Sequence, residues 1–267
     1  MCVLTKDLAL KFEKAEIDSL TSRLMAVQSI KDNSMCVDIR DFGGARAFSV
    51  KHIPGPAFNT VKGLSTEAIP FLDHILDFFK EKEIPCRFEL TPTNTSSEVC
   101  TSLTERGFYQ SNFHTLLYGS TNANQAAVPE TIMIRKLEDH EFDSFGDIYV
   151  RGFGMPSFLK EDIARNNQVL NGLKNWRVLA AMVEGELAGV AVLYTNGKCA
   201  DLAAAVTVPE ARNRGVQRAL LAERFKLASS LGCHYIIGQA QFGSASQRNM
   251  QRAGMNIAYT KAIWVQR

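Results

Sequence analysis

The sequence lacks several features that would place it in a specialised class of protein. No apolar run approaches the ~20 residues that span a bilayer, and the first residues contain no apolar segment typical of a signal peptide. Lysine plus arginine (30) nearly balance aspartate plus glutamate (28), and no block of one sign stands out. We therefore expect a soluble, cytoplasmic protein that binds neither a membrane nor a nucleic acid.

The spacing typical of metal ligands is also missing. The six cysteines include no Cys-x-x-Cys pair, and the five histidines are dispersed along the chain. A chain of 267 residues can build a sufficient core without disulfides. We expect reduced cysteines and no metal.

The composition is that of a globular protein, with 46% hydrophobic and 22% charged residues. A stretch of small and polar residues, Ser120–Pro129, has the composition of a linker and divides the chain into halves of similar length. We expect one domain over residues 1–122 and a second over residues 128–267.

The second half has a clear order of elements. Apolar alternation and helical spacing predict a strand, two helices, three antiparallel strands, a helix, a strand, a helix and a strand. Asp139 is the expected N-cap of the first helix, and Asn196-Gly197 is the expected hairpin turn. The expected strands are 132–137, 177–183, 188–194, 202–208, 235–239 and 258–265, and the later helices are 159–170, the one that begins near Gly215, and 246–253.

The first half repeats part of this order. It predicts helices over 69–80 and 98–106 and strands over 87–90 and 115–118, and Gly107-Phe108 follows its last helix as Gly254-Met255 follows the corresponding helix of the second half. Two interpretations remain open, a degenerate copy of the second half and an unrelated α+β domain.

The segment after Val208 carries the strongest functional signal. A strand stops at Pro209, a loop with Arg212, Arg214 and Gly215 follows, and then a helix begins. The first N–H groups of a helix have no partner within it, and the helix dipole adds roughly half a positive charge there. With a glycine that permits close approach and two arginines, this is the chemistry of a pyrophosphate site. An ordinary strand-loop-helix corner with solvated arginines is the alternative.

This loop resembles the acyl-CoA loop of the GNAT superfamily of N-acetyltransferases, Arg/Gln-x-x-Gly-x-Gly/Ala after the fourth strand. Arg212 and Gly215 match that pattern, whereas Gln217 stands where Gly or Ala is usual. The resemblance covers about residues 131–267. It implies an α/β (α+β) GNAT fold with a mixed, mostly antiparallel sheet flanked by helices, in two tandem halves of which the first lacks a CoA loop.

The resemblance also implies acetyl-CoA as cosubstrate. The residues it assigns to acetyl-CoA lie at the end of the fourth strand, in the loop and first helical turn, and on the last helix. They are Val206, Thr207, Val208, Arg212, Asn213, Arg214, Gly215, Val216, Gln217, Arg218 and Asn249. In such enzymes a backbone N–H of the fourth strand, here near Ala205, Val206 or Thr207, meets the thioester carbonyl.

Two side chains are candidates for proton transfer. Asp201 stands where the family often has a carboxylate base; the alternative is a solvated residue at the end of the hairpin. Met250 stands where many members have a tyrosine that protonates the leaving thiolate, and methionine has no proton to donate. Tyr259 on the last strand is the substitute, or else a packed aromatic residue.

The leading functional hypothesis is an N-acetyltransferase that moves an acetyl group from acetyl-CoA to a primary amine of a small molecule, amino acid or peptide. A non-catalytic CoA-binding or interaction module is the alternative, favoured by Met250 and Gln217. A longer acyl-CoA as donor is a third. A monomer and a homodimer are both compatible with the sequence.

Overall fold

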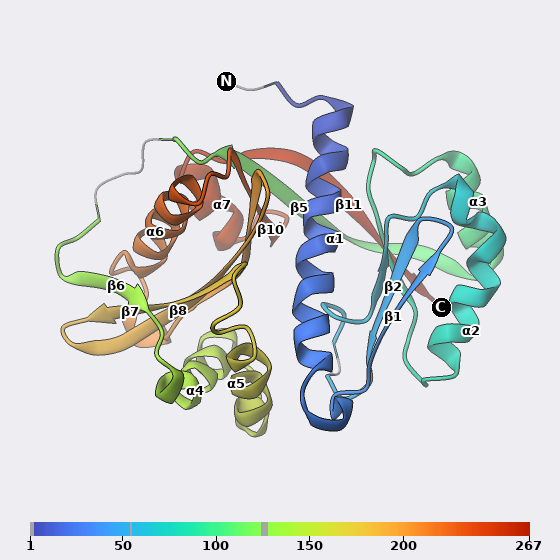
Figure 1. The fold of residues 1–267 in the computed structure, drawn as a ribbon. Coiled ribbons are helices and arrows are strands. Elements are labelled where there is room, and N and C mark those ends of the chain that lie inside the picture. Colours follow the sequence, from blue (N-terminus) through green and yellow to red (C-terminus); the bar gives the residue numbers. More distant parts are fainter. Residues whose placement is uncertain (1–2, 54, 124–127) are drawn as a thin grey trace. The chain divides into compact units, whose positions relative to one another are not determined.

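The computed structural model describes residues 3–53, 55–123 and 128–267, and the chain forms two compact units (Figure 1). Unit 1 contains the described residues up to Leu116, with Ala240–Phe242 and Ile257–Arg267. Unit 2 contains the described residues of 117–239 and Gly243–Asn256. The middle of the expected linker, residues 124–127, and Cys2 lie outside the described residues. The five described cysteines are free thiols.

Unit 1 combines a sheet with three helices. Its strands run in the order β1-β2-β3-β4-β11, with β3 and β4 parallel and the other pairs antiparallel. A long strand, β5, starts in this unit and ends in unit 2. The elements are α1 (Lys6–Gln28), β1 (Val37–Phe42), β2 (Ala45–Val50), β3 (Thr60–Lys62), α2 (Leu72–Lys80), β4 (Arg87–Leu90), α3 (Ser97–Glu105), β5 (Phe108–Ser120) and β11 (Asn256–Gln266).

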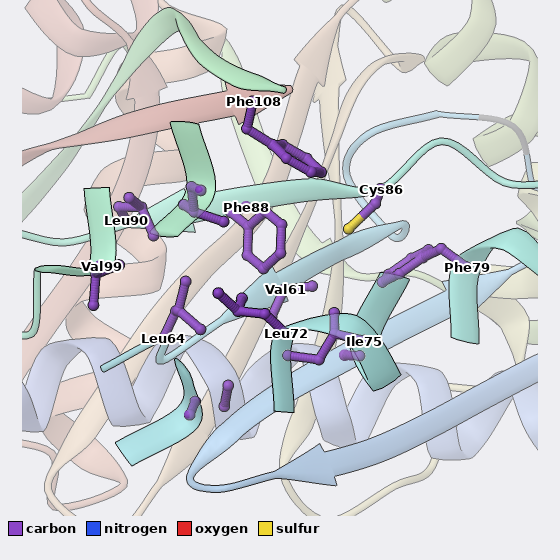
Figure 2. Packing of buried hydrophobic residues seen from close by; sticks show 14 of the residues in the cluster. Val61, Leu64, Leu72, Ile75, Phe79, Cys86, Phe88, Leu90, Val99 and Phe108 are labelled. Atoms are coloured by element: carbon purple, nitrogen blue, oxygen red, sulfur yellow. The ribbon is translucent and has the colours of Figure 1, made fainter. Parts of the chain in front are cut away.

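The apolar core of unit 1 lies between the sheet and helices α2 and α3 (Figure 2). Phe88 of β4 and Phe108 at the start of β5 meet edge to face, with ring centroids 5.1 Å apart. Leu72 and Ile75 from α2, both fully buried, complete the layer. Such aromatic contacts add to the free energy gained by removing apolar area from water.

From β6 to α7, unit 2 has the order expected from the sequence, whereas the expected last strand, β11, clusters with unit 1. Its strands run β6-β7-β8-β9-β10, antiparallel as far as β9, and β10 is parallel to β9. The fold prediction of a mixed, mostly antiparallel sheet flanked by helices is confirmed. The elements are β6 (Ile132–Lys136), α4 (Phe142–Phe153), α5 (Lys160–Gln168), β7 (Trp176–Val183), β8 (Glu186–Asn196), β9 (Cys199–Thr207), α6 (Val216–Ser230), β10 (Tyr235–Gln241) and α7 (Ala245–Arg252).

The expected cap of α4 is wrong in one detail. Asp139 lies inside a 3-10 turn, Asp139–Glu141, that precedes the helix. The cap is a capping box in which the Glu141 carboxylate accepts the backbone N–H of Glu138 at 2.9 Å. Arg135 also donates to both oxygens of the Glu141 carboxylate, each at 2.6 Å.

A buried ionic network holds unit 1 together. The ammonium groups of Lys62 and Lys261 both bind Glu16 of α1 and Glu89 of β4; the Lys261 distances are 2.6 and 2.8 Å. All four residues are buried. Burial raises the pKa of both carboxyl groups, but the charges of Lys261 and Lys62 outweigh it, so that each pKa lies below its usual value.

We predict that Lys261→Met lowers the free energy of unfolding of unit 1 by about 3–5 kcal/mol, because two buried carboxylates then share one ammonium group. Lys14→Met is the control: it breaks an ion pair to Asp18 whose lysine side chain is 75% exposed, worth at most about 1 kcal/mol. Urea unfolding in a Trp176→Phe background measures both, because Trp264 of β11 is then the remaining tryptophan. Equal midpoints for the two variants would show that the network does not stabilise the fold.

Candidate active site

The parallel pair β9 and β10 separates partway along its length. Their ladder joins residues 199–201 to residues 235–237, and both strands continue beyond it. Leu202–Ala205, the next residues of β9, are only half-buried. Two parallel strands that diverge leave backbone groups available to a ligand that enters between them.

Met250 lies at the point where the strands separate. A Cβ built on Gly238, the first residue of β10 after the ladder, would lie 2.8 Å from Met250 Sδ and 3.1 Å from Leu202 Cδ1. Met250 itself is buried. Met250 is the residue at which the family resemblance expects a tyrosine. A larger residue at position 238 would require the Met250 side chain to shift.

The backbone of the loop before α6 adopts the geometry that glycine and asparagine favour. Asn213 has φ 63° and Gly215 has φ 92°, both in the left-handed region. Gly215 is the N-cap of α6 and supplies no side-chain cap. The first-turn N–H groups of Val216, Gln217 and Arg218 therefore remain available for an anion. This fits the pyrophosphate of a CoA ester.

The two loop arginines bind protein groups in this structure. Arg212 donates to the carbonyl oxygen of Gly152 at 2.8 Å, and Arg214 binds Glu184 at 2.5 Å. Gly152, in the last turn of α4, packs so closely on β9 that an added Cβ would lie 2.1 Å from Val206 Cγ2. The arginines are exposed and tie the loop to α4 and to the β7–β8 turn. Their charge contributes to the potential at the loop without requiring direct contact with a phosphate.

The other residues predicted to bind the cosubstrate are distributed around this loop. Gln217 donates its side-chain amide to Thr207 Oγ1 at 2.9 Å. This draws the amide toward β9 and leaves the backbone of the first helical turn uncovered by that side chain. The side chains of Val206, Val208 and Val216 are buried, Arg218 is exposed, and Asn249 on α7 is half-buried and accepts a bond from Arg252 at 3.3 Å.

Asp201 is the last residue of the β9–β10 ladder and is buried. Solvation at the end of the hairpin, the alternative considered from the sequence, therefore does not describe it. Burial lowers the pKa of the Arg224 guanidinium on α6 to about 9, and the charge of Asp201 opposes that shift. Sequence reasoning missed Arg224. The available signal was an arginine four residues after Leu220 and four before Ala228, in the apolar stripe of the helix.

Tyr259, the second candidate for proton transfer, belongs to unit 1. Its ring is buried, and burial followed by the charges of Glu16 and Glu13 raises its pKa. The structure places it with the buried ionic network and does not bring it together with Asp201 inside one unit. Its proposed role as proton donor stays a prediction.

The direction of the β9 backbone N–H groups follows from one hydrogen bond. Val208 donates its N–H to the Ala188 carbonyl oxygen at 3.0 Å, toward β8. Because successive N–H groups of a strand point to opposite sides, those of Ala205 and Thr207 point away from β8, to the side of β10. That is the side on which the ladder has ended.

Within residues 3–53, 55–123 and 128–267, no group of three or more His, Cys, Asp or Glu side chains is placed to hold a metal ion. No helix in the same residues is long and apolar enough to cross a membrane.

Comparison with known proteins shows similarity to one family and to several solved structures. The family described as Acetyltransferase (GNAT) matches residues 142–255. No curated protein matches. Among solved structures, a GCN5-related N-acetyltransferase from Kribbella flavida is similar at 12% identity and a TM-score of 0.66, over 91% of this chain and 95% of its own.

Two further structures extend the similarity. A functionally unknown conserved protein from Staphylococcus epidermidis matches at 13% identity and a TM-score of 0.64, over 91% of this chain and 98% of its own. A tandem GNAT protein from the clavulanic acid biosynthesis pathway matches at 13% identity and a TM-score of 0.60, over 82% and 77%. At these identities the likeness concerns the fold.

Proposed function

Because residues 142–255 match the Acetyltransferase (GNAT) family, we propose that this chain transfers an acetyl group from acetyl-CoA to a primary amine of a small molecule, amino acid or peptide. The observation that carries the proposal is the separation of β9 from β10 after Asp201, beside the uncapped start of α6. Together they supply a gap for the pantetheine arm and N–H donors for the pyrophosphate.

Transfer requires a C–N bond to form and a C–S bond to break, while the amine loses a proton and the thiolate gains one. Fixing acetyl-CoA on the loop supplies orientation. The N–H of Ala205, directed toward the side of β10, is the proposed donor to the thioester carbonyl oxygen as negative charge develops there. Asp201 is the proposed base, with a carboxylate at the end of the ladder.

A non-catalytic CoA-binding module is the second candidate, and Met250 favours it. This buried thioether lies where the strands separate and has no proton to give. Release of free thiol from acetyl-CoA in the presence of a panel of amines decides between the two. Amine-dependent release supports the enzyme and leaves water or another group to protonate the thiolate. Tight acetyl-CoA binding without release for any amine supports the module.

We predict that Gly215→Val weakens acetyl-CoA binding at least tenfold, or about 1.4 kcal/mol. A β-branched residue is strained at φ 92°, and its added atoms crowd the start of α6, with Pro129 Cγ 3.3 Å from the new Cβ. Gly232→Val at the other end of α6 is the matched control, because it has φ 78° and open space around its Cβ. Calorimetry on both folded variants makes the comparison. Equal affinities would remove the loop from the binding site.

Asp201→Asn is expected to lower turnover by roughly 10²–10⁴, the usual worth of a general base, with little change in acetyl-CoA affinity. The loss shrinks at high pH, where the amine is already neutral. A pH profile of kcat for parent and variant measures it. Equal turnover at pH 7 would assign the proton to water or to the amine's own equilibrium.

Unit 1 contains a parallel pair, β3 and β4, in the same arrangement as β9 and β10, but its corresponding loop is closed. A Cβ on Gly63, directly after β3, would lie 3.4 Å from Ile17 Cδ1 of α1 and 3.3 Å from the Gly44 carbonyl oxygen. Lys62 beside it is bound to Glu16 of α1 and to Glu89. Helix α1 thus packs against this loop through Ile17 and binds its lysine through Glu16.

We therefore expect one acetyl-CoA per chain, bound to unit 2. Calorimetric titration of the full-length chain measures the stoichiometry. Two equivalent sites, or a single site abolished by a bulky substitution at Gly63 but unaffected by one at Gly215, would contradict this assignment.

A further inference from the structure

Arg224 occupies a core position of unit 2 that an aliphatic residue would fill at lower cost. The residue is 2% exposed and lies in the buried stripe of α6 with Leu220 and Ala228. Burial lowers its pKa to about 9, and the charge of Asp201 opposes the change, so the guanidinium is cationic at neutral pH. A buried charge usually lowers stability relative to a well-packed apolar side chain. Stability alone therefore does not account for this arginine.

The guanidinium makes one bond outside its own helix. Its Nε donates to Leu220 O at 3.0 Å, one turn earlier in α6, and its Nη1 donates to Ala204 O of β9 at 3.2 Å. The Ala204 carbonyl and the Ala205 N–H belong to one planar trans peptide group and point in opposite directions. A bond that holds the carbonyl oxygen therefore also fixes the direction of the N–H.

This peptide group lies directly after an irregular part of β9. Val192 pairs with Ala204 and Tyr194 with Asp201, so β9 has one residue more than β8 over this interval. A bulge of this kind interrupts the ladder and re-aims the backbone that follows. On the other side of β9, the ladder to β10 ends at Asp201. The β8 ladder resumes at Ala204, directly after the bulge, whereas β10 pairs with none of residues 202–207, and α6 supplies an additional tether to the Ala204 carbonyl oxygen.

We propose that Arg224 is a positioning residue: its bond to the Ala204 carbonyl oxygen aims the Ala205 N–H at the thioester carbonyl oxygen and increases its polarity. The inference rests on the proposed acetyl transfer and adds to it a side chain that acts through the backbone. A hydrogen bond from a cation to the carbonyl polarises the whole peptide group, which strengthens the donor at its other end. The donor is then oriented before substrate arrives, as electrostatic stabilisation of a developing oxyanion requires.

The test compares Arg224→Met and Arg224→Lys with a control, Ala228→Gly. The control weakens α6 one turn later and leaves the hydrogen bond from Arg224 to β9 in place. Three quantities are measured: kcat per acetyl-CoA-binding site, the acetyl-CoA Kd, and hydrogen exchange of a peptide covering residues 202–208. For Arg224→Met we expect kcat per site to fall at least tenfold, Kd to stay within threefold, and exchange to accelerate. Arg224→Lys has one ammonium group in place of the guanidinium that binds two carbonyl oxygens. We expect its kcat per site and its exchange rate to lie between those of Arg224→Met and those of the parent. Ala228→Gly keeps kcat per site and the exchange of residues 202–208.

Unchanged kcat per site in Arg224→Met, or a Kd that weakens in proportion to the loss of activity, would overturn the proposal. If Arg224→Met does not fold, Arg224→Lys is used in its place. Parental values of both kcat per site and exchange in Arg224→Lys would then overturn the proposal. A parent that binds acetyl-CoA without turnover counts against the proposed function. The exchange comparison still tests whether Arg224 holds the β9 backbone, and unaltered exchange in both arginine variants rejects it.

Discussion

The parallel contact between β9 and β10 is the constraint on which the site depends. It holds residues 199–201 against residues 235–237 and then stops, so that the two strands diverge from a fixed point. Asp201 lies at this point, Met250 lies beside it over Gly238, and the rest of β9 leads to the loop before α6. A longer ladder would pair the backbone groups on which the proposed binding of acetyl-CoA depends.

Each unit contains a parallel pair of strands, but the surroundings of the two pairs differ. In unit 1, α1 packs against the loop that follows β3, and its Glu16 joins a network of buried charges with Lys62 and Glu89. In unit 2 the start of α6 is uncapped and the glycine before it has φ 92°. The same strand arrangement thus gives a packed core in one unit and a proposed ligand site in the other.

Most elements of unit 2 could be predicted from the sequence, because apolar residues alternate along β6–β10 and recur at helical spacing along the helices between them. It was insufficient for α1, the longest helix, whose buried face includes Glu13, Glu16 and Arg23 and so lacks an apolar stripe. The last strand, β11, clusters with unit 1 because of tertiary contacts, which the local sequence pattern does not reveal. The loop glycine was predictable from its motif. The bulge in β9 and the proposed role of Arg224 were not predictable, since both depend on how β9 pairs with its neighbouring strands.

A crystal structure with a non-hydrolysable analogue of acetyl-CoA tests the central claim most directly. The account predicts the pyrophosphate on the backbone N–H groups of residues 215–218 and the carbonyl oxygen of the acyl group within hydrogen-bonding distance of Ala205 N. An analogue whose pyrophosphate lies against Gly63 of unit 1, or whose carbonyl oxygen faces away from β9, would contradict it.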